Sequence, residues 1–268
     1  MYLEDFKITS LNMLNFHTLP TSTKSVPATF LLLIVVIFAG CSSDEPIQFP
    51  VPTPIPPPTA TPVPPPPPTA TETIALSRAA MIALDSFNFQ LTHESGHTTL
   101  SGALQLTRAG GLVAINGLDI EAEANIGRAF VKVKAVVIGE QTWMTNPLTG
   151  VWSEIAAEDS PFSFLDPVKL VADILGDTQQ AAYSSDSKSA SAGDLIVTGT
   201  IRAQSLAALV GSVDLDAVPS VVLTLDLRNK RLKKIVISGP VQPEDESDTI
   251  RVITLSEFDE PVSLEPPI

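Results

Sequence analysis

The sequence predicts an α+β domain in which a curved antiparallel sheet carries short helices on one side. Three observations support this. Apolar and polar residues alternate with a period of two in several stretches, two or three short segments have helical spacing, and no strand–helix–strand pattern repeats. The missing repeat disfavours a parallel sheet. We place this domain at residues 73–268, because the composition of the earlier residues differs.

The composition narrows the functional classes. The 268 residues include 30 acids, 16 bases and one cysteine, with a formal net charge of −14. Nucleic-acid binding needs Lys and Arg patches that neutralise phosphates, so we do not expect nucleic acid as a partner. A single cysteine excludes an internal disulfide and a cysteine-based zinc cluster. Hydrophobic residues make up 44%, which suits a folded domain with an aliphatic core.

Residues 1–40 are predicted to be a signal peptide. The run ATFLLLIVVIFAG at 28–40 follows Lys24 and ends in small residues. It is shorter than the ~20 residues that a membrane-spanning helix needs, which favours cleavage. The segment Phe38-Ala39-Gly40-Cys41 resembles a bacterial lipobox, and this resemblance implies that Cys41 becomes a diacylated first residue. The alternative is an uncleaved anchor followed by an unmodified cysteine.

Residues 41–72 are predicted to form an extended stalk behind the lipidated cysteine. Between Pro46 and Pro68 lie 13 of the 24 prolines. Proline fixes φ and has no amide donor, so this stretch favours polyproline II over a packed core. At ~3.1 Å per residue it would act as a semi-rigid spacer of roughly 70 Å.

The predicted domain opens with a helix and two strands. Residues 74–86, IALSRAAMIALDS, have the spacing of a short amphipathic helix. The next residues alternate, and we expect a hairpin that turns at Ser95-Gly96. Its apolar positions are Phe87, Phe89 and Leu91, followed by Leu100, Leu104 and Leu106.

Later segments repeat these patterns. The segment WMTNPLTGVW predicts a hairpin whose paired strands carry Trp143 and Trp152. Asp166 is the expected N-cap of a helix over 166–175 that ends at Gly176, and a further helix is expected at 204–210. Three further strands are expected to have one apolar face. They carry Val131 and Val133; Leu195, Val197 and Ile201; and Val221, Leu223, Leu225 and Leu227.

One motif suggests an enzyme. His93-Glu94-Ser95-Gly96-His97 matches HExxH, which binds zinc when a helix places both histidines on one face. Here it follows a strand, where the imidazoles would stand about 13 Å apart, and it contains a glycine. We therefore interpret the histidines as exposed turn residues and keep a zinc protease as a minor alternative.

Other catalytic signatures are missing from the sequence. It contains no GxSxG, Walker or GxGxxG motif, so we expect neither an enzyme nor a cofactor. The acidic run 244–248 lacks the ligand spacing of a calcium loop, and we interpret it as a solvated connection between strands.

Several features together resemble the LppX/LprAFG family of bacterial lipoproteins. They are the signal with its lipobox cysteine, the polar linker, the strand hairpins, TWMTNPLTGVWSEI, FLDPVKLVADIL and the closing ITLSEFDEPVSLEPP. The resemblance covers residues 73–268. It implies an incomplete β-barrel, similar to the LolA fold, whose concave side and covering helices enclose an apolar cavity for acyl chains of lipids or glycolipids. It also implies no catalysis.

The resulting hypothesis is a lipid-anchored extracytoplasmic carrier of lipids or glycolipids. Its partners would be acyl chains, the membrane that holds Cys41 and a membrane transporter. The candidate cavity residues are Leu100, Leu104, Leu106, Val131, Val133, Leu195, Val197, Ile201, Leu223 and Leu225. The alternative is a surface-displayed interaction or structural module whose core is filled and binds no ligand. A cavity of several hundred Å³ would favour the carrier.

Overall fold

The computed structural model describes residues 66–100, 104–185 and 193–268. The predicted signal peptide, Cys41 and most of the stalk lie outside these residues. Chain contacts group Pro62–Ile268 into one compact unit, which contains every helix and strand described below. None of the helices in the described ranges combines the length and apolar character needed to span a membrane.

Short helical elements alternate with long runs of strands. The helical elements are α1 (Ala70–Ile82), η2 (Ala157–Asp159), α2 (Pro167–Asp177), η3 (Ala203–Leu206) and α3 (Ala207–Val210). The strands are β1 (Ser86–Ser95), β2 (Thr98–Leu100), β3 (Leu104–Ala114), β4 (Gly117–Ile126), β5 (Ala129–Ile138), β6 (Gln141–Thr145), β7 (Trp152–Ile155), β8 (Gln179–Tyr183), β9 (Asp194–Thr200), β10 (Ser220–Asp226), β11 (Leu232–Ser238) and β12 (Ile250–Ser256).

All strands join one antiparallel sheet, which confirms the predicted α+β class. Its order is β7-β6-β5-β4-β3-β1-β12-β11-β10-β9-β8, with β2 paired to β3. Two meanders, β3 to β7 and β8 to β12, meet at β1, where Phe89 pairs with Gly111 on one side and with Leu255 on the other. The sheet is open because β7 and β8 form its two edges, so it is a half-barrel.

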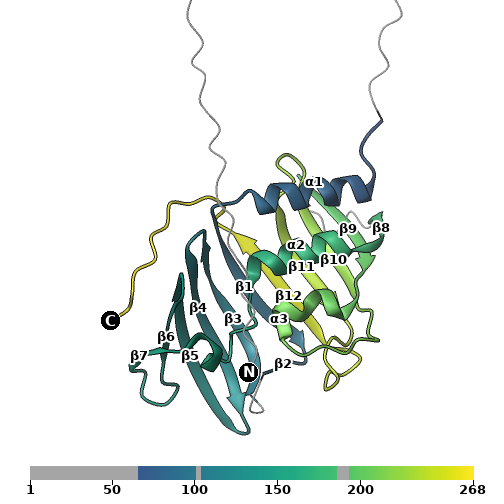
Figure 1. Ribbon diagram of the computed structural model, residues 1–268. Helices are drawn as coiled ribbons and strands as arrows, with labels where there is room; N and C mark the ends of the chain where they lie inside the picture. The colour runs from purple at the N-terminus through teal and green to yellow at the C-terminus, as the bar shows by residue number, and fades with distance from the viewer. Residues whose placement is uncertain (1–65, 101–103, 186–192) are drawn as a thin grey trace, which may run out of the picture. The chain divides into compact units, whose positions relative to one another are not determined.

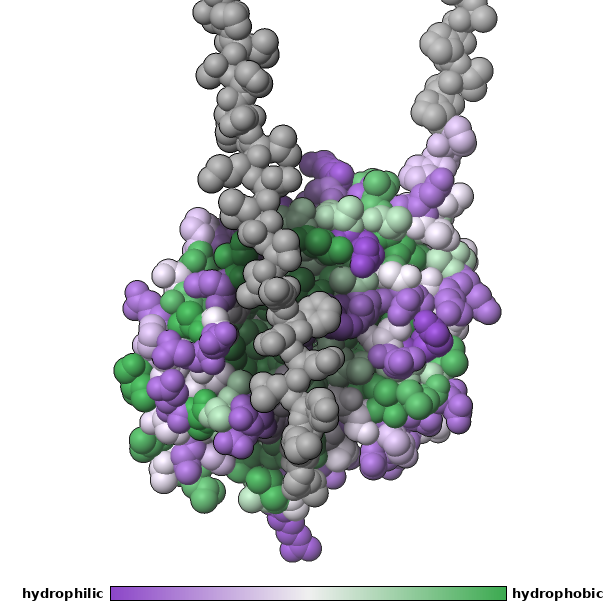
Figure 2. Space-filling model, viewed as in Figure 1, coloured by the Kyte–Doolittle hydropathy of each residue, from purple (hydrophilic) through white to green (hydrophobic). Residues whose placement is uncertain are grey.

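The helices lie on the concave side of this sheet (Figure 1). α2 contacts α1, η3 and α3, and α1 also contacts β8. Inward-facing residues of the strands and the buried sides of the helices form one hydrophobic core. Figure 2 shows this side with hydrophobic residues in its recessed middle and a mixture of hydrophilic and hydrophobic residues around it.

The first helix differs from its prediction in position and in character. It covers 70–82 rather than 74–86, because Thr69 is the N-cap and forms a capping box with Glu72. It is also not amphipathic. Ile74 and Met81 are buried, but Leu76 and Ile82 expose about half of their surface, 51% and 50%.

The predicted hairpin turn at Ser95-Gly96 is wrong. β1 and β2 both pair with β3, so the chain bends at Ser95-Gly96 and continues in the same direction. Gly96 has a φ of +75°, and a Cβ there would lie 2.7 Å from the Thr249 hydroxyl oxygen. The connection from β2 to β3 falls at 101–103, outside the described residues.

The tryptophan hairpin and the two later helices agree with their predictions. Trp152 of β7 pairs with Thr145 of β6 across the hairpin. Trp143 also lies on β6, so the two tryptophans are on paired strands. The Asp166 carboxylate caps α2 by accepting from the Lys169 amide at 2.9 Å. This helix continues one residue past Gly176, to Asp177. The predicted third helix corresponds to η3 and α3.

Candidate functional site

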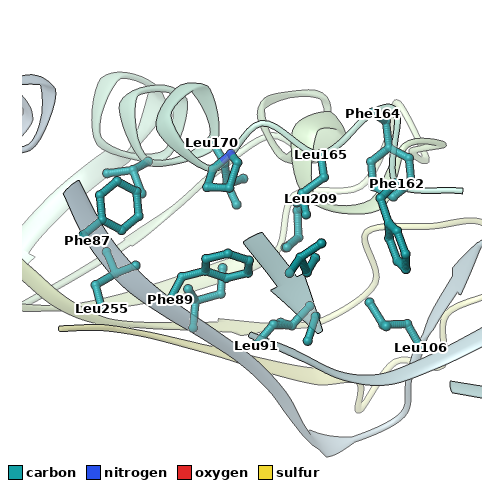
Figure 3. A pocket seen from close by; sticks show the side chains of 15 residues that line it. Phe87, Phe89, Leu91, Leu106, Phe162, Phe164, Leu165, Leu170, Leu209 and Leu255 are labelled. Atoms are coloured by element: carbon teal, nitrogen blue, oxygen red, sulfur yellow. The ribbon is translucent and has the colours of Figure 1, made fainter. Parts of the chain in front are cut away.

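An apolar interior lies between the concave side of the sheet and the helical elements (Figure 3). All side chains that line it are hydrocarbon. Its floor comes from the central strands β1, β3, β4 and β12, with Phe87, Phe89, Leu91, Leu106, Ala109, Ile120, Ile253 and Leu255. Its roof is Phe162, Phe164, Leu165, Pro167, Leu170, Val171 and Leu209.

Strand alternation explains how the sequence builds this floor. Phe87, Phe89 and Leu91 occupy every second position of β1, so all three point to the same side of the sheet. The neighbouring positions on β3 are Val113, Gly111 and Ala109. The residues opposite Phe89 and Leu91 are the small Gly111 and Ala109, and a Cβ at Gly111 would collide with the backbone of Asp119 on β4.

The interior is almost filled in this conformation. The cavity between these side chains has a volume of about 20 Å³, roughly the room of one water molecule. Cavities for small-molecule ligands usually measure about 300–1,000 Å³. The expected large enclosed space is therefore not present, because aromatic and aliphatic side chains of the roof occupy it.

Four of the seven roof residues lie in residues 157–168, which comprise η2, the connection that follows it and the first two residues of α2, and which we call the strap. The hydrogen bonds given for its backbone are local, such as Phe162 N to Ser160 Oγ at 3.2 Å and Leu165 N to Phe162 O at 2.9 Å. Within the described residues, no hydrogen bond or ion pair joins the strap to the sheet. The strap is thus held over the sheet by apolar contacts, with Phe162 only 7% exposed.

Two open grooves lie against the strap. The β5 groove, of about 630 Å³, lies between the strap and β3 to β6 and includes Leu118, Ala135 and Val137. The α3 groove, of about 490 Å³, lies between the strap, β2 and the end of α3. Ile120, Phe162, Leu165 and Pro167 line both the β5 groove and the apolar interior. Only side chains therefore separate this groove from the interior.

The ten aliphatic residues predicted for the cavity are placed unevenly. Nine are fully buried or nearly so, and Leu195 is partly buried against the same core. Leu106 lines the apolar interior, and Leu100 lines the α3 groove. The other eight lie in the core without lining the interior or either groove: Leu104, Val131, Val133, Leu195, Val197, Ile201, Leu223 and Leu225. Contact of any of the ten with a ligand stays a prediction.

Sequence reasoning missed the aromatic side chains of the site. Phe87 and Phe89 were recognised only as strand residues, and the strap residues Phe162 and Phe164 were not considered. A signal was present in SPFSFLDP, which places three large apolar residues in a connection rich in turn formers. Connections normally expose their side chains, so such residues indicate a segment that covers something.

The HExxH histidines do not form a metal site. Their interpretation as exposed turn residues is wrong, because both are partly buried and His93 belongs to β1, where its Nδ1 lies 3.0 Å from the Thr107 carbonyl and its Nε2 lies 3.0 Å from Thr98 Oγ1. Because a carbonyl only accepts, Nδ1 carries the proton and Nε2 accepts from the threonine. Burial lowers the pKa of His93, and nearby Arg251 lowers it further. No group of three potential ligands that could hold a metal occurs in the described ranges.

The acidic run 244–248 is not wholly solvated, which corrects its interpretation. The Asp245 carboxylate is 4% exposed and binds the guanidinium of Arg251, which is fully buried. Burial alone would raise the pKa of Asp245, but hydrogen bonds from Arg251 and from the Gln242 and Val241 amides lower it below the usual value. Arg251 also donates to Thr98 Oγ1 at 2.9 Å, which connects this pair to His93.

Comparisons with known proteins agree with this architecture. The structure of LprF from Mycobacterium bovis superposes with a TM-score of 0.53 at 16% identity, covering 74% of this chain and 96% of that one. Lipoprotein LppX from Mycobacterium tuberculosis gives 0.50 at 18% identity, covering 73% and 98%. No curated protein sequence matches. The family model described as LppX_LprAFG lipoprotein matches residues 69–264, and the chain therefore belongs to the LppX_LprAFG lipoprotein family.

Proposed function

We propose that this protein is a lipid-anchored extracytoplasmic carrier that binds acyl chains of lipids or glycolipids between its sheet and the strap. Cys41 would hold it on the membrane, and residues 46–68 would act as the spacer. It would exchange its lipid with a membrane or with a membrane transporter, and it would catalyse no reaction. Membership of a lipoprotein family supports the membrane attachment.

The observation that carries the proposal is the hydrocarbon interior beneath a strap that no hydrogen bond joins to the sheet within the described residues. An acyl chain needs an apolar surface and no charged group. Each methylene moved from water into such a site gains about 0.8 kcal/mol, so a sixteen-carbon chain gains on the order of 12 kcal/mol before entropy costs.

Binding would require the strap to move. The enclosed cavity of about 20 Å³ does not accept an acyl chain, whereas the adjoining β5 groove of about 630 Å³ is open. We infer that a chain enters along the β5 groove and displaces Phe162 and Leu165. Lifting these side chains into water costs roughly 1.5–3 kcal/mol each, which is well below the gain from a long acyl chain.

A second function has one observation in its favour. The filled interior is what a displayed interaction or structural module with an ordinary core would have. Such a module would present a surface on its stalk and bind no lipid. The two functions differ in whether lipid is taken up.

Native mass spectrometry after incubation with liposomes tests the choice. The carrier predicts a lipid adduct on the chain from Ser42 onward, and a bare polypeptide after repeated incubation would favour the display module. Ala135→Phe fills the β5 groove and should reduce uptake, because Ala135 lines that groove. Ala129→Phe adds the same ring at an exposed position of the same strand and should leave uptake unchanged.

A further inference from the structure

Among the described residues, no other element covers the outer side of α1, which carries exposed apolar side chains. Its buried side packs on the domain through Ile74, Ser77 and Met81. Its other side is exposed, where Leu76 and Ile82 lie among the alanines, and the exposed Thr71, Glu72 and Arg78 are also on the solvent side. Leu76 and Ile82 each expose about half of their surface, and two large aliphatic side chains exposed on one short helix indicate a binding surface.

Basic residues gather in the connection between β10 and β11 and at the start of β11, although the protein as a whole is acidic. The segment LRNKRLKK at 227–234 holds five of the 16 bases. Arg231 pairs with Asp259, and Lys233 pairs with Asp194 and Asp226. Arg228 and Lys230 form no ion pair with any described residue. Beside them Leu227 is 47% exposed.

The basic connection and α1 lie at the same end of the sheet. The Leu232 amide, at the start of β11, contacts the Met81 sulfur of α1 at 3.3 Å. Figure 1 shows the connection projecting beyond α1 at this end. The exposed Ile115 in the β3–β4 turn belongs to the same end, because Ala114 pairs with Ser86, four residues after α1.

The predicted stalk joins the domain at this end as well. Thr69 is the N-cap of α1, and the Tyr183 hydroxyl of β8 donates to the Pro68 carbonyl at 2.9 Å. The same hydroxyl lies 2.6 Å from Thr73 Oγ1. The last residues before the helix are therefore fixed to the domain beside α1.

We propose that the outer face of α1 and the β10–β11 connection form a docking surface for an anionic phospholipid bilayer. Apolar side chains of α1 would enter the interface, and Arg228 and Lys230 would contact the lipid phosphates. The net charge of −14 repels anionic membranes, and Arg228 and Lys230, which have no ion-pair partner among the described residues, would offset this repulsion locally. The proposal does not depend on acyl chains being carried.

A second copy of the protein is a less suitable occupant of this surface. A two-fold contact would bring the same surface of each copy together. Arg228 and Lys230 of one copy would then lie near the same two bases of the other copy. Within the described residues, neither base forms an ion pair with an acid that could offset this repulsion. An anionic membrane supplies the opposite charge to both residues.

Vesicle sedimentation tests the proposal with the unlipidated chain from Ser42 onward. We expect binding to vesicles of phosphatidylglycerol mixed with phosphatidylcholine, weaker binding to pure phosphatidylcholine, and a decrease with added salt. Leu76→Glu/Ile82→Glu and Arg228→Glu/Lys230→Glu should each weaken binding by roughly tenfold or more. Circular dichroism and thermal unfolding check that these exposed substitutions leave the fold intact.

The matched control is Leu148→Glu/Arg128→Glu, in exposed turns at the opposite end of the sheet. It should bind like the unchanged protein. Absence of binding by the unchanged protein, or equal loss in the control, would overturn the proposal. A concentration-dependent dimer in sedimentation velocity that Leu76→Glu/Ile82→Glu abolishes would assign the surface to a second copy instead. Native mass spectrometry of the same variants measures lipid uptake separately, so failure of docking and failure of carriage are distinguishable.

Discussion

The fully buried guanidinium of Arg251 donates to both carboxylate oxygens of Asp245, from Nη2 to Oδ1 at 2.7 Å and from Nη1 to Oδ2 at 2.8 Å. The pair joins β12 to the connection that precedes it. Arg251 lies two positions before Ile253, which lines the apolar interior, so the pair lies at one end of that interior. Ionised groups at such depth are stable only while both partners remain.

Removal of one partner should therefore destabilise the domain strongly. We expect Arg251→Met to lower the free energy of unfolding by about 3–5 kcal/mol, because Asp245 stays buried without a counterion. Denaturant titration followed by circular dichroism measures this change. Lys132→Met breaks an exposed pair with Glu121 and should have little effect. Equal effects of the two substitutions would contradict the importance of the buried pair.

Stability should fall below neutral pH because of His93. The pKa of His93 in the folded protein is below the unfolded value of about 6.5. The contribution of His93 to the free energy of unfolding is therefore complete above that pH and is lost as the pH falls toward the folded pKa. His93→Gln should flatten the decrease in unfolding free energy between about pH 7 and 5. An unchanged slope in His93→Gln would contradict this role. Asp245 adds a loss of the same sign only below about pH 4, since its folded pKa is also lowered.

Phe162 should control access to the interior. Phe162→Ala removes a buried ring from the roof of the interior and should cost about 3 kcal/mol of stability. The same change should increase binding of an apolar fluorophore, since the vacated space adjoins the open β5 groove. Phe130→Ala, at a side chain 61% exposed, should change neither quantity. Unchanged fluorophore binding by Phe162→Ala would show that the strap does not close the interior.

Cys41 should determine membrane retention. Cys41→Ser removes the thiol that would carry the diacylglyceryl group, and we expect the protein to leave the membrane fraction. Fractionation of cells that express each form measures this, with Ser42→Ala as the control. Retention of the serine variant in the membrane would instead show that residues 28–40 stay attached as an anchor.

The sheet was predictable because its signal is local. Alternation in β5, β10 and similar stretches identifies a strand and its inward face from a few neighbouring residues. The bend at Gly96 was not predictable in this way, because it depends on Thr249, far away in the sequence. The capping box at Thr69 was visible in the sequence but was overlooked.

The site was less predictable than the fold. Val133 and Leu223 have the same pattern as Phe89 and Leu91, yet only the latter two line the interior, because the strap covers the middle of the sheet. Which strands become central depends on pairing between distant segments. Arg251 gave a usable signal, since an arginine at an inward position of IRVITLS requires a buried acid, and Asp245 lies six residues before it.

The position of β1 has a consequence for how the chain folds. This strand is made early, but one of its two neighbours is β12, and Asn88 pairs with Ser256 close to the C-terminus. During synthesis β12 leaves the ribosome only after all the other described strands, so until then one edge of β1 keeps unpaired backbone groups. We expect slow completion of the sheet and strong sensitivity to changes in β12, as is usual when distant segments pair.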